Sequence, residues 1–451
     1  MNTAIETAVT TAGPAPLPDA GLRHAALPAP DDAARRRGVA AAVVGNTLEF
    51  YDFTTYAFFA VTIGRTFFPA GDAWLSLLAS VATFGVGFVT RPIGGVFIGA
   101  YADRAGRKPA MMLTIGLMAV GMLMLALTPG FATIGIAAPI LIVIGRLIQG
   151  FALGGEVGPS TAYLIESAPP VKRGLYASWQ LASQGIATLA AGTIGLALSL
   201  ALTPEQMQDW GWRVPFLIGL LIIPVGFYIR RAMPETAGEC AGQAEATTGA
   251  VLSRLLRDHG GTLALMVPIL LCGTVSTYVG NYMTTYAITT LKLPASLSIA
   301  ATAVVGVCVL VFSLLAGRLA DAYGRRLVMI VPRVLLLFSA YPAFLVMTQH
   351  PGPATLLGVS ALIATLGAMS GAASLVAIPE LLPRSVRSAG LSVAYAFVVT
   401  VFGGTTQLVV TWLIGVTGDP LAPAWYVIAT SLVGVATMLA TPETRGEALS
   451  A

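Results

Sequence analysis

Long apolar stretches separated by short polar breaks recur along the chain after residue 38. A helix that crosses a bilayer needs about 20 mostly apolar residues. By that length the pattern predicts twelve spans. Their approximate cores are 39–67, 74–100, 110–128, 134–164, 175–201, 213–229, 263–290, 297–319, 328–348, 354–378, 389–414 and 424–441. We therefore predict an all-α polytopic membrane protein whose solvent is the lipid bilayer.

The composition excludes several other classes of protein. Hydrophobic residues make up 56% of the chain and charged residues only 10%, whereas soluble domains average about 25% charged residues. The net charge of +4 is small and scattered, so we expect no nucleic-acid partner. Three cysteines, Cys240, Cys272 and Cys308, have no regular spacing. An odd number of irregularly spaced cysteines predicts neither a disulfide framework nor a metal site.

Basic residues divide unequally between the two sides that the twelve spans define. Arg35–Arg37 precede the first span, and most other loop arginines and lysines fall on the same side. The opposite side holds only Arg65, Arg213 and Lys292. Because cytoplasmic loops carry the excess of Lys and Arg, we expect both termini in the cytoplasm. The predicted location is the cell inner membrane, crossed many times.

The longest polar interruption after the N-terminal tail separates the sixth and seventh spans. It divides the chain into two six-helix halves. The tail itself is rich in proline and lacks an apolar stretch of signal-peptide length, so we expect it to be disordered rather than cleaved. The predicted organisation is a disordered cytoplasmic tail (1–38), a six-helix bundle (39–230), a cytoplasmic linker (231–262), a second six-helix bundle (263–441) and a cytoplasmic tail (442–451).

The two halves repeat one loop. "GAYADRAGRK" at 99–108 recurs as "GRLADAYGRR" at 317–326, each after the second span of its half. A weaker repeat follows the fourth spans, where an acid precedes an arginine by seven positions in both halves. These pairs are Glu166 with Arg173 and Glu380 with Arg387. Two parallel six-helix repeats are a known transporter plan, with a central site between the halves.

The repeated loop resembles the signature of the major facilitator superfamily, G-x-x-x-D-R-x-G-R-[KR]. The first copy fits fully, and the second has Ala322 where the signature has arginine. The resemblance implies the major facilitator fold and a cytoplasmic gate. Asp103 would lie near a helix N-terminus of the facing half, and Arg107 and Lys108 could pair with acids there. The alternative is that these cations only set topology. The gate residues would be Asp103, Arg104, Arg107, Lys108, Asp321, Arg325 and Arg326.

Charged residues inside the predicted spans need an explanation, because a charge at mid-bilayer costs about 2.5–3.5 kcal/mol. Five stand out: Glu49, Asp52, Arg91, Arg146 and Glu156. No histidine falls in a span, so a transported proton would be carried by carboxylates or water. Asn46, Glu49, Asp52 and Tyr56 form one polar stripe, and two neighbouring acids resist ionising together. We predict that Glu49, Asp52 and Glu156 couple transport to protons. The alternative is a fixed network with an arginine of a neighbouring helix.

Longer motifs narrow the resemblance. "GNTLEFYDF" at 45–53, "RPIGG" at 91–95 and "GRLIQGFALGGE" at 145–156 resemble the metabolite:proton symporter family. Within it, "GRTFFP" at 64–69 and "SWQLASQ" at 178–184 are most similar to the citrate and tricarballylate symporters. The resemblance implies proton-coupled uptake of a di- or tricarboxylate by alternating access. The expected partners are therefore a small carboxylate and protons.

Arg91 and Arg146 have two interpretations. A guanidinium binds a carboxylate bidentately, so they form a substrate clamp or act as internal counter-ions. Neutral polar residues of the spans extend the predicted cavity, although each could instead join helices. The predicted substrate-binding residues are Asn46, Arg91, Arg146, Gln149, Gln180, Gln184, Tyr278, Asn281, Tyr282 and Gln407.

Other functions stay open at this point. Relatives in the family carry zwitterionic osmolytes or other small metabolites (betaine, proline, shikimate, 2-oxoglutarate), and the aromatic faces of Tyr278, Tyr282 and Tyr286 would suit a cation. A passive facilitator is a further alternative. We do not expect an enzyme, because the spans contain no nucleophile with a nearby base, no H-E-x-x-H and no G-x-S-x-G. We expect no catalytic residue, metal or cofactor, and a monomer driven by the proton gradient.

Overall fold

The computed structural model describes residues 32–105, 107–154, 157–221, 223–224, 226 and 257–446. Every regular element in these ranges is helical. The first half contains α1 (Asp32–Phe58), α2 (Ala60–Phe67), α3 (Ala73–Val89), α4 (Arg91–Ala105), α5 (Arg107–Leu127), α6 (Phe131–Ile134), α7 (Ala137–Ala152), α8 (Val157–Glu166), η1 (Pro170–Lys172), α9 (Arg173–Ala201), α10 (Pro204–Asp209), η2 (Gly211–Arg213) and α11 (Val214–Gly219).

The second half follows the same plan with longer unbroken helices. It contains α14 (Gly260–Thr289), α15 (Ala295–Tyr323), α16 (Arg325–Gln349), α17 (Pro353–Glu380), α18 (Arg384–Val398), η3 (Val399–Gly403), α19 (Gly404–Thr417) and α20 (Ala422–Ala440). Within the described ranges, eight helical segments are long and apolar enough to cross a membrane. The first predicted span falls on α1 and α2, the third on α5, and the fourth on α7 and α8. The sixth begins at α11, and the other predicted spans fall on the eight long segments.

Several spans are interrupted rather than continuous. α1 and α2 meet at Phe59, α3 and α4 at Thr90, and a π-helical turn, η3, separates α18 from α19. π-turns and breaks inside helices are frequent at functional sites, and broken helices are tolerated in membranes where they face protein or a cavity. The interruptions therefore direct attention to the space between the halves.

The first helix begins earlier than expected. Residues 32–38, which the sequence suggested were part of a disordered tail, belong to α1. The segment "DAARRR" explains this difference, because alanine and arginine have high helix propensity and acids favour a helix N-terminus. Residues 1–31, 227–256 and 447–451 lie outside the described ranges, so the predictions for the rest of the tail and most of the linker stay predictions.

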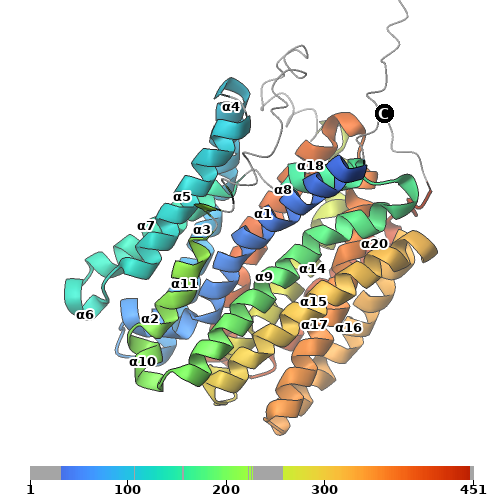
Figure 1. The fold of residues 1–451 in the computed structure, drawn as a ribbon. Helices are drawn as coiled ribbons and strands as arrows, with labels where there is room; N and C mark the ends of the chain where they lie inside the picture. Colours follow the sequence, from blue (N-terminus) through green and yellow to red (C-terminus); the bar gives the residue numbers. More distant parts are fainter. Residues whose placement is uncertain are drawn as a thin grey trace, which may run out of the picture.

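α9 of the first half and α15 of the second run side by side through the molecule (Figure 1). Glycines let their backbones touch. A Cβ on Gly185 would lie 2.4 Å from the backbone nitrogen of Leu310, and one on Gly306 would lie 2.3 Å from that of Leu189. Small residues permit this close approach in membranes, where packing rather than the hydrophobic effect holds helices together.

A second pair of helices, α3 and α19, joins the halves elsewhere. A Cβ on Gly85 would lie 2.5 Å from the carbonyl oxygen of Gly404. The indole nitrogen of Trp74 donates to the carbonyl of Thr411 at 3.4 Å, and the hydroxyl of Thr400 donates to the carbonyl of Phe88 at 3.1 Å. These contacts lie at the boundary between the halves, and residues of both halves line a cavity there.

Candidate functional site

The cavity lies between the two halves. Residues from α1, α9, α14, α15, α17, α18 and η3 line it. Gln184 of α9 and Tyr278 and Asn281 of α14 contribute polar groups, and all three were predicted to bind substrate. Phe50 and Phe53 of α1 supply aromatic wall. Few polar groups on an otherwise apolar, concave surface are typical of a small-molecule site.

Asp52 and Arg146 form a fully buried ion pair beside this cavity. Arg146 Nη1 lies 2.8 Å from Asp52 Oδ2, and both side chains have 0% exposure. The guanidinium also stacks on the Tyr56 ring, 3.9 Å from its centroid. Among the described residues, Asp52 Oδ1 and Arg146 Nε and Nη2 have no hydrogen-bond partner. Removing one partner of a buried pair leaves a costly unpaired charge, so the two groups depend on each other.

Arg91 is buried in an aromatic setting. Its guanidinium carbon lies 4.7 Å from the Phe53 centroid and 4.2 Å from that of Phe88. Phe88 in turn packs edge-on against Tyr278, with ring centroids 5.8 Å apart. The described residues provide no carboxylate partner for Arg91, and its Nε is unbonded there. Cation–π contacts of this kind are worth about 2 kcal/mol when desolvated.

Two other predicted residues, Asn46 and Gln180, join helices within the first half, while the Gln149 side chain is buried without a hydrogen bond in the described structure. Asn46 of α1 donates to the Gln180 carbonyl at 3.0 Å and to Ser183 Oγ at 2.5 Å. The Gln180 amide donates back to Asn46 Oδ1 at 3.1 Å. Gln149 lies against α5, where a Cβ on Gly121 would be 2.3 Å from Gln149 Cγ. These contacts support the alternative interpretation of joining helices for Asn46 and Gln180.

The polar stripe of α1 thus splits among three neighbours. Tyr56 donates to the Ser80 carbonyl at 3.1 Å, Asp52 faces Arg146, and Asn46 faces α9. Glu49 is half-buried, and Glu156 lies outside the described residues. The sequence left two interpretations open for Asp52: a proton carrier beside Glu49, or a member of a fixed network with an arginine of a neighbouring helix. The structure pairs Asp52 with Arg146 of α7, as in the second interpretation.

The predicted binding set therefore divides in two. Gln184, Tyr278 and Asn281 line the cavity. Seven others lie outside its lining: Asn46, Arg91, Arg146, Gln149, Gln180, Tyr282 and Gln407. Tyr282 accepts a hydrogen bond from Thr411 at 2.9 Å, and Gln407 is fully buried with its amide unbonded in the described structure. Sequence reasoning missed the wall that α17 provides, and also Arg333 of α16, which is fully buried.

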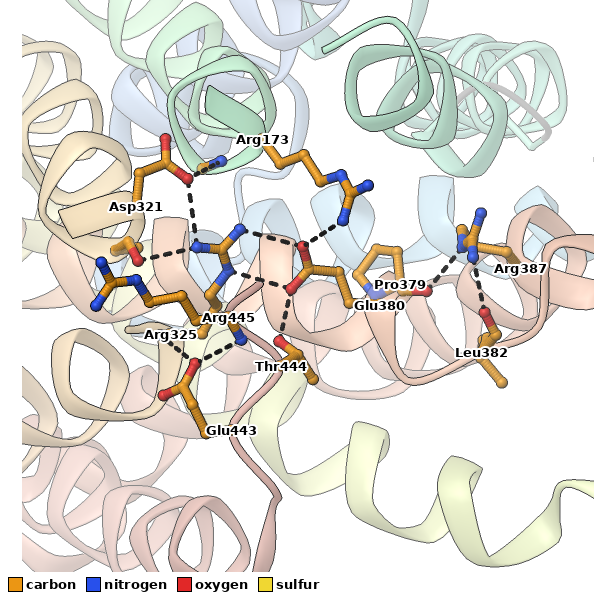
Figure 2. A network of polar contacts seen from close by, with 12 residues as sticks. Arg173, Asp321, Arg325, Pro379, Glu380, Leu382, Arg387, Glu443, Thr444 and Arg445 are labelled. Atoms are coloured by element: carbon orange, nitrogen blue, oxygen red, sulfur yellow. Dashed lines mark hydrogen bonds and ion pairs between the residues drawn. The ribbon is translucent and has the colours of Figure 1, made fainter. Parts of the chain in front are cut away.

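A network of charged residues joins the two halves (Figure 2). We call the end of the molecule where it lies the latch end; its members are Glu166, Arg173, Asp321, Arg325, Glu380, Arg387 and Glu443. Asp321 of α15 accepts hydrogen bonds from the backbone N–H of Gly174 at 2.8 Å and of Leu175 at 3.0 Å. These amides belong to the first turn of α9. A carboxylate at a helix N-terminus binds unsatisfied amides and the positive end of the helix dipole. The sequence predicted such a contact for Asp103 of the first loop copy, whose side chain lies outside the described part, and the structure shows it for Asp321 of the second copy.

Glu380 of α17 is the centre of this network (Figure 2). Arg325 binds it with both arms of its guanidinium, Nε at 3.1 Å and Nη2 at 3.2 Å. Arg325 also lies 3.3 Å from Asp321, and the Thr444 hydroxyl donates to Glu380 at 2.5 Å. Bidentate pairs of this kind are strong and geometrically specific. Arg325 therefore orients both acids.

The acids and arginines of the weaker repeat pair across the halves. Arg173 of α9 lies 3.9 Å from Glu380 of α17. Glu166 of α8 lies 3.3 Å from Arg387 of α18, which also donates to the Pro379 carbonyl at 2.9 Å. Each half thus gives one acid and one arginine to the other, and this links the two bundles at the latch end.

The C-terminal segment closes the network. Glu443 accepts the backbone N–H groups of Arg325 and Arg326 at 2.8 and 2.9 Å, and that of Arg445 at 2.9 Å. Gly324, which begins this turn, has φ of +103°, a conformation that only glycine adopts without strain. Arg326 also donates to the Leu439 carbonyl at 2.5 Å. The side chains of Asp103, Arg104, Arg107 and Lys108, in the first loop copy, lie outside the described part.

Two helical halves, a cavity between them and a latch at one end define a transporter of the major facilitator type. The profile of the "Sugar (and other) transporter" family matches residues 38–250 and 241–451. The chain belongs to this family, and the resemblance to the major facilitator superfamily and the twelve-helix fold are confirmed. It is a multi-pass membrane protein.

The names of the curated relatives give two kinds of substrate, citrate and proline or betaine. The citrate-proton symporter of Klebsiella pneumoniae is 37% identical over 391 residues, 87% of this chain and 88% of the relative. That of Salmonella typhi is 36% identical, with coverage of 87% and 90%. The proline/betaine transporter of Salmonella typhimurium is 30% identical, with coverage of 93% and 86%.

Solved structures share the fold. A crystal structure of the D-xylose-proton symporter has a TM-score of 0.72 at 20% identity, with 92% of this chain and 99% of that chain covered. The same kind of protein bound to 6-bromo-6-deoxy-D-glucose gives a TM-score of 0.71, also at 20% identity, with coverage of 92% and 98%.

Proposed function

We propose that this chain is a proton-coupled symporter that takes up a di- or tricarboxylate of the citrate type by alternating access. The citrate-proton symporters are 36–37% identical to it over most of both chains, which supports this substrate class. The cavity between the halves, which is mostly apolar with a few polar groups, supplies a place for one small molecule. We further propose that the latch end and both termini face the cytoplasm and that the membrane is the inner one.

The proposed coupling between proton and substrate binding rests on the buried pair of Asp52 and Arg146. Arg146 has two nitrogens and Asp52 one oxygen without partners among the described residues. A proton bound to Asp52 removes its charge, so the pair loses its main attraction. Arg146 is then an uncompensated cation beside the cavity, and an anionic substrate restores neutrality. Proton and substrate binding therefore favour each other. Glu49 and Glu156 stay candidates for the same role.

Energy enters through the proton gradient. Each elementary charge moved down the membrane potential supplies about 2.3 kcal/mol per 100 mV. The latch end must open to release the substrate, and its ion pairs between halves break in that step. Loss of the proton from Asp52 re-forms the pair with Arg146, and this returns the empty protein to its starting state.

Uptake into proteoliposomes tests the proposal. The full chain is reconstituted, the lumen is made alkaline, and labelled citrate is supplied outside at lower pH. Accumulation above the external concentration, abolished by a protonophore, is the expected result. Uptake that ignores the pH gradient would instead make the chain a passive facilitator, and absence of citrate uptake would overturn the substrate class.

An osmolyte transporter is the second candidate function. A proline/betaine transporter is 30% identical to this chain, and Phe50, Phe53, Tyr278 and Tyr395 line the cavity. Aromatic faces bind quaternary ammonium groups. Competition separates the two functions, because citrate should displace bound labelled citrate while a large excess of betaine should not.

A further inference from the structure

Arg333 is a buried cation in the second half of the molecule. It belongs to α16, and its side chain has 0% exposure. A charge inside a membrane protein is costly and marks a functional site by default. Neither the latch network nor the Asp52–Arg146 pair includes Arg333, so its position requires a separate explanation.

Neutral groups of two neighbouring helices bind the guanidinium. Nη1 donates to the Cys272 carbonyl at 3.0 Å and to Ser276 Oγ at 2.7 Å, both on α14. Nε donates to Ser370 Oγ on α17 at 3.2 Å. Nη2 has no partner within the described structure. Hydroxyls and carbonyls satisfy some of the five N–H donors of Arg333 but none of its charge.

The described residues of the second half include no carboxylate that could neutralise this charge inside the membrane. Its described acids are Asp321, Glu380, Asp419 and Glu443 together with Asp258, all at helix ends or in loops. No ion pair joins Arg333 to any of them. Arg146 of the first half, in contrast, has Asp52. Arg146 thus has a counter-charge inside the protein, whereas Arg333, like Arg91, has no carboxylate partner among the described residues.

Ser276 connects Arg333 to the cavity. It lines the cavity, as do Gly273 one turn earlier and Gly367 of the facing α17. A Cβ on Gly273 would meet no atom within 4 Å, so the space beside Ser276 is open. The Ser276 hydroxyl donates to the Cys272 carbonyl at 2.8 Å, an acceptor that Arg333 already uses. A small rotation would therefore free this O–H for a ligand without orphaning the carbonyl.

We propose that Ser276 and Arg333 form a carboxylate subsite in the second half of the cavity. Ser276 donates its hydroxyl to one carboxylate of the substrate, and Arg333 behind it supplies the compensating charge. A hydroxyl that accepts a bond from a cation is polarised and donates more strongly. Arg333 is thus a positioning residue that acts through Ser276. The substrate class, although not the subsite, rests on the proposed function.

Ser370 provides a matched control for Ser276. Both serines bond to Arg333, but only Ser276 lines the cavity. If Arg333 merely holds helices together, Ser276→Ala and Ser370→Ala should lower stability alike and leave ligand affinity unchanged. If the subsite exists, only Ser276→Ala should weaken the ligand. Arg318→Gln, an exposed arginine on α15, controls for the loss of a positive charge.

The test uses the purified full chain and measures Kd from ligand-induced thermal stabilisation with citrate, tricarballylate, succinate and glycine betaine. We expect Ser276→Ala and Arg333→Gln to weaken citrate roughly 10- to 100-fold, the effect of losing one hydrogen bond to a charged group. Arg333→Lys should recover part of that loss, while Ser370→Ala and Arg318→Gln should match the wild type. If Arg333→Gln does not fold, Ser276→Ala against Ser370→Ala decides.

The outcomes separate the two proposals. Unchanged citrate affinity in Ser276→Ala and Arg333→Lys, or equal losses in Ser276→Ala and Ser370→Ala, would overturn the subsite while leaving citrate symport intact. Binding of betaine but not citrate would overturn the substrate class, and the same variants should then weaken betaine through its single carboxylate. A wild type that binds none of the four carboxylates would overturn both.

Discussion

Glu166 and Arg387 lie 3.3 Å apart across the boundary between the two halves, and their counterparts in the repeat, Arg173 and Glu380, lie 3.9 Å apart in the reverse sense. The sequence places an acid seven residues before an arginine in each half. The structure shows that the partners pair between halves rather than within them. Because the exchange is reciprocal, separating the bundles at this end breaks both pairs.

Removing the charge of Glu166 or of Glu380, the two acids of these ion pairs, should open the latch end to different extents. Glu166 is 36% exposed and Glu380 only 3%. Exposed pairs are worth about 0.2–1 kcal/mol, whereas removing one partner of a buried pair costs about 3–5 kcal/mol. We therefore expect Glu166→Gln to open the latch end modestly and Glu380→Gln to open it strongly and to lower thermal stability.

Alkylation of a cysteine placed at Ala368, on the cavity wall, measures this opening in a background without other cysteines. A maleimide that does not cross the membrane should react faster from the latch side in both variants, with the larger gain in Glu380→Gln. Equal, unaltered reaction rates in the two variants would show that these pairs do not hold the latch closed.

Asp52→Asn should separate folding from coupling. The substitution leaves Arg146 charged and buried, which costs about 3–5 kcal/mol of stability. The double variant Asp52→Asn with Arg146→Gln removes both charges and should regain most of the thermal stability. Neither variant should accumulate citrate when the lumen is alkaline. If Asp52→Asn accumulates citrate as the wild type does, the proton carrier would instead be Glu49 or Glu156.

Acid should release the C-terminal segment. Burial alone would raise the pKa of Glu443, but three backbone N–H groups and the charge of Arg325 lower it below its usual value of 4.5. A carboxyl whose folded pKa is lowered stabilises the fold above its unfolded pKa, and this contribution is lost as the pH falls through the folded pKa.

The wild type should accordingly be more stable than Glu443→Gln near pH 7. The difference should disappear as the pH falls below 4.5, and thermal unfolding across this range measures it. A difference that is constant with pH would mean that the glutamate acts through its shape rather than its charge.

The spans and the repeated loop could be predicted because apolar length and a ten-residue motif are local properties of the sequence. The motif predicted a contact with a helix N-terminus for Asp103, because an aspartate stabilises such an end, and the structure shows this contact for Asp321, its counterpart in the second copy. The cross-pairing of Glu166 with Arg387 could not be predicted, because spacing does not say which half supplies a partner.

The site was harder to predict than the fold. A polar stripe at helical spacing put Asn46 and Asp52 on one face of α1, yet α9 covers the first and Arg146 of α7 binds the second. Arg333 lies five residues inside its predicted span, where a long side chain often extends to the interface. Only the contacts with Ser276 and Ser370 show that it points inward.

The contact between α3 and α19 offers a test of alternating access at a single atom. A Cβ on Gly85 would lie 2.5 Å from the Gly404 carbonyl oxygen, closer than real Cβ atoms approach backbone. Gly85→Ala should therefore push the two helices apart, disfavour the arrangement in which they meet and slow citrate exchange in proteoliposomes several-fold while the protein still folds.

Gly116→Ala is the matched control, because a Cβ there meets no atom within 4 Å and the position is exposed on α5. In a helix interior alanine is favoured over glycine by about 1 kcal/mol, so this variant should transport normally and unfold at a slightly higher temperature. Exchange that is equally fast in Gly85→Ala and Gly116→Ala would mean that α3 and α19 need not meet during the cycle. Other contacts between the halves, such as that of α9 with α15, would then have to guide their motion.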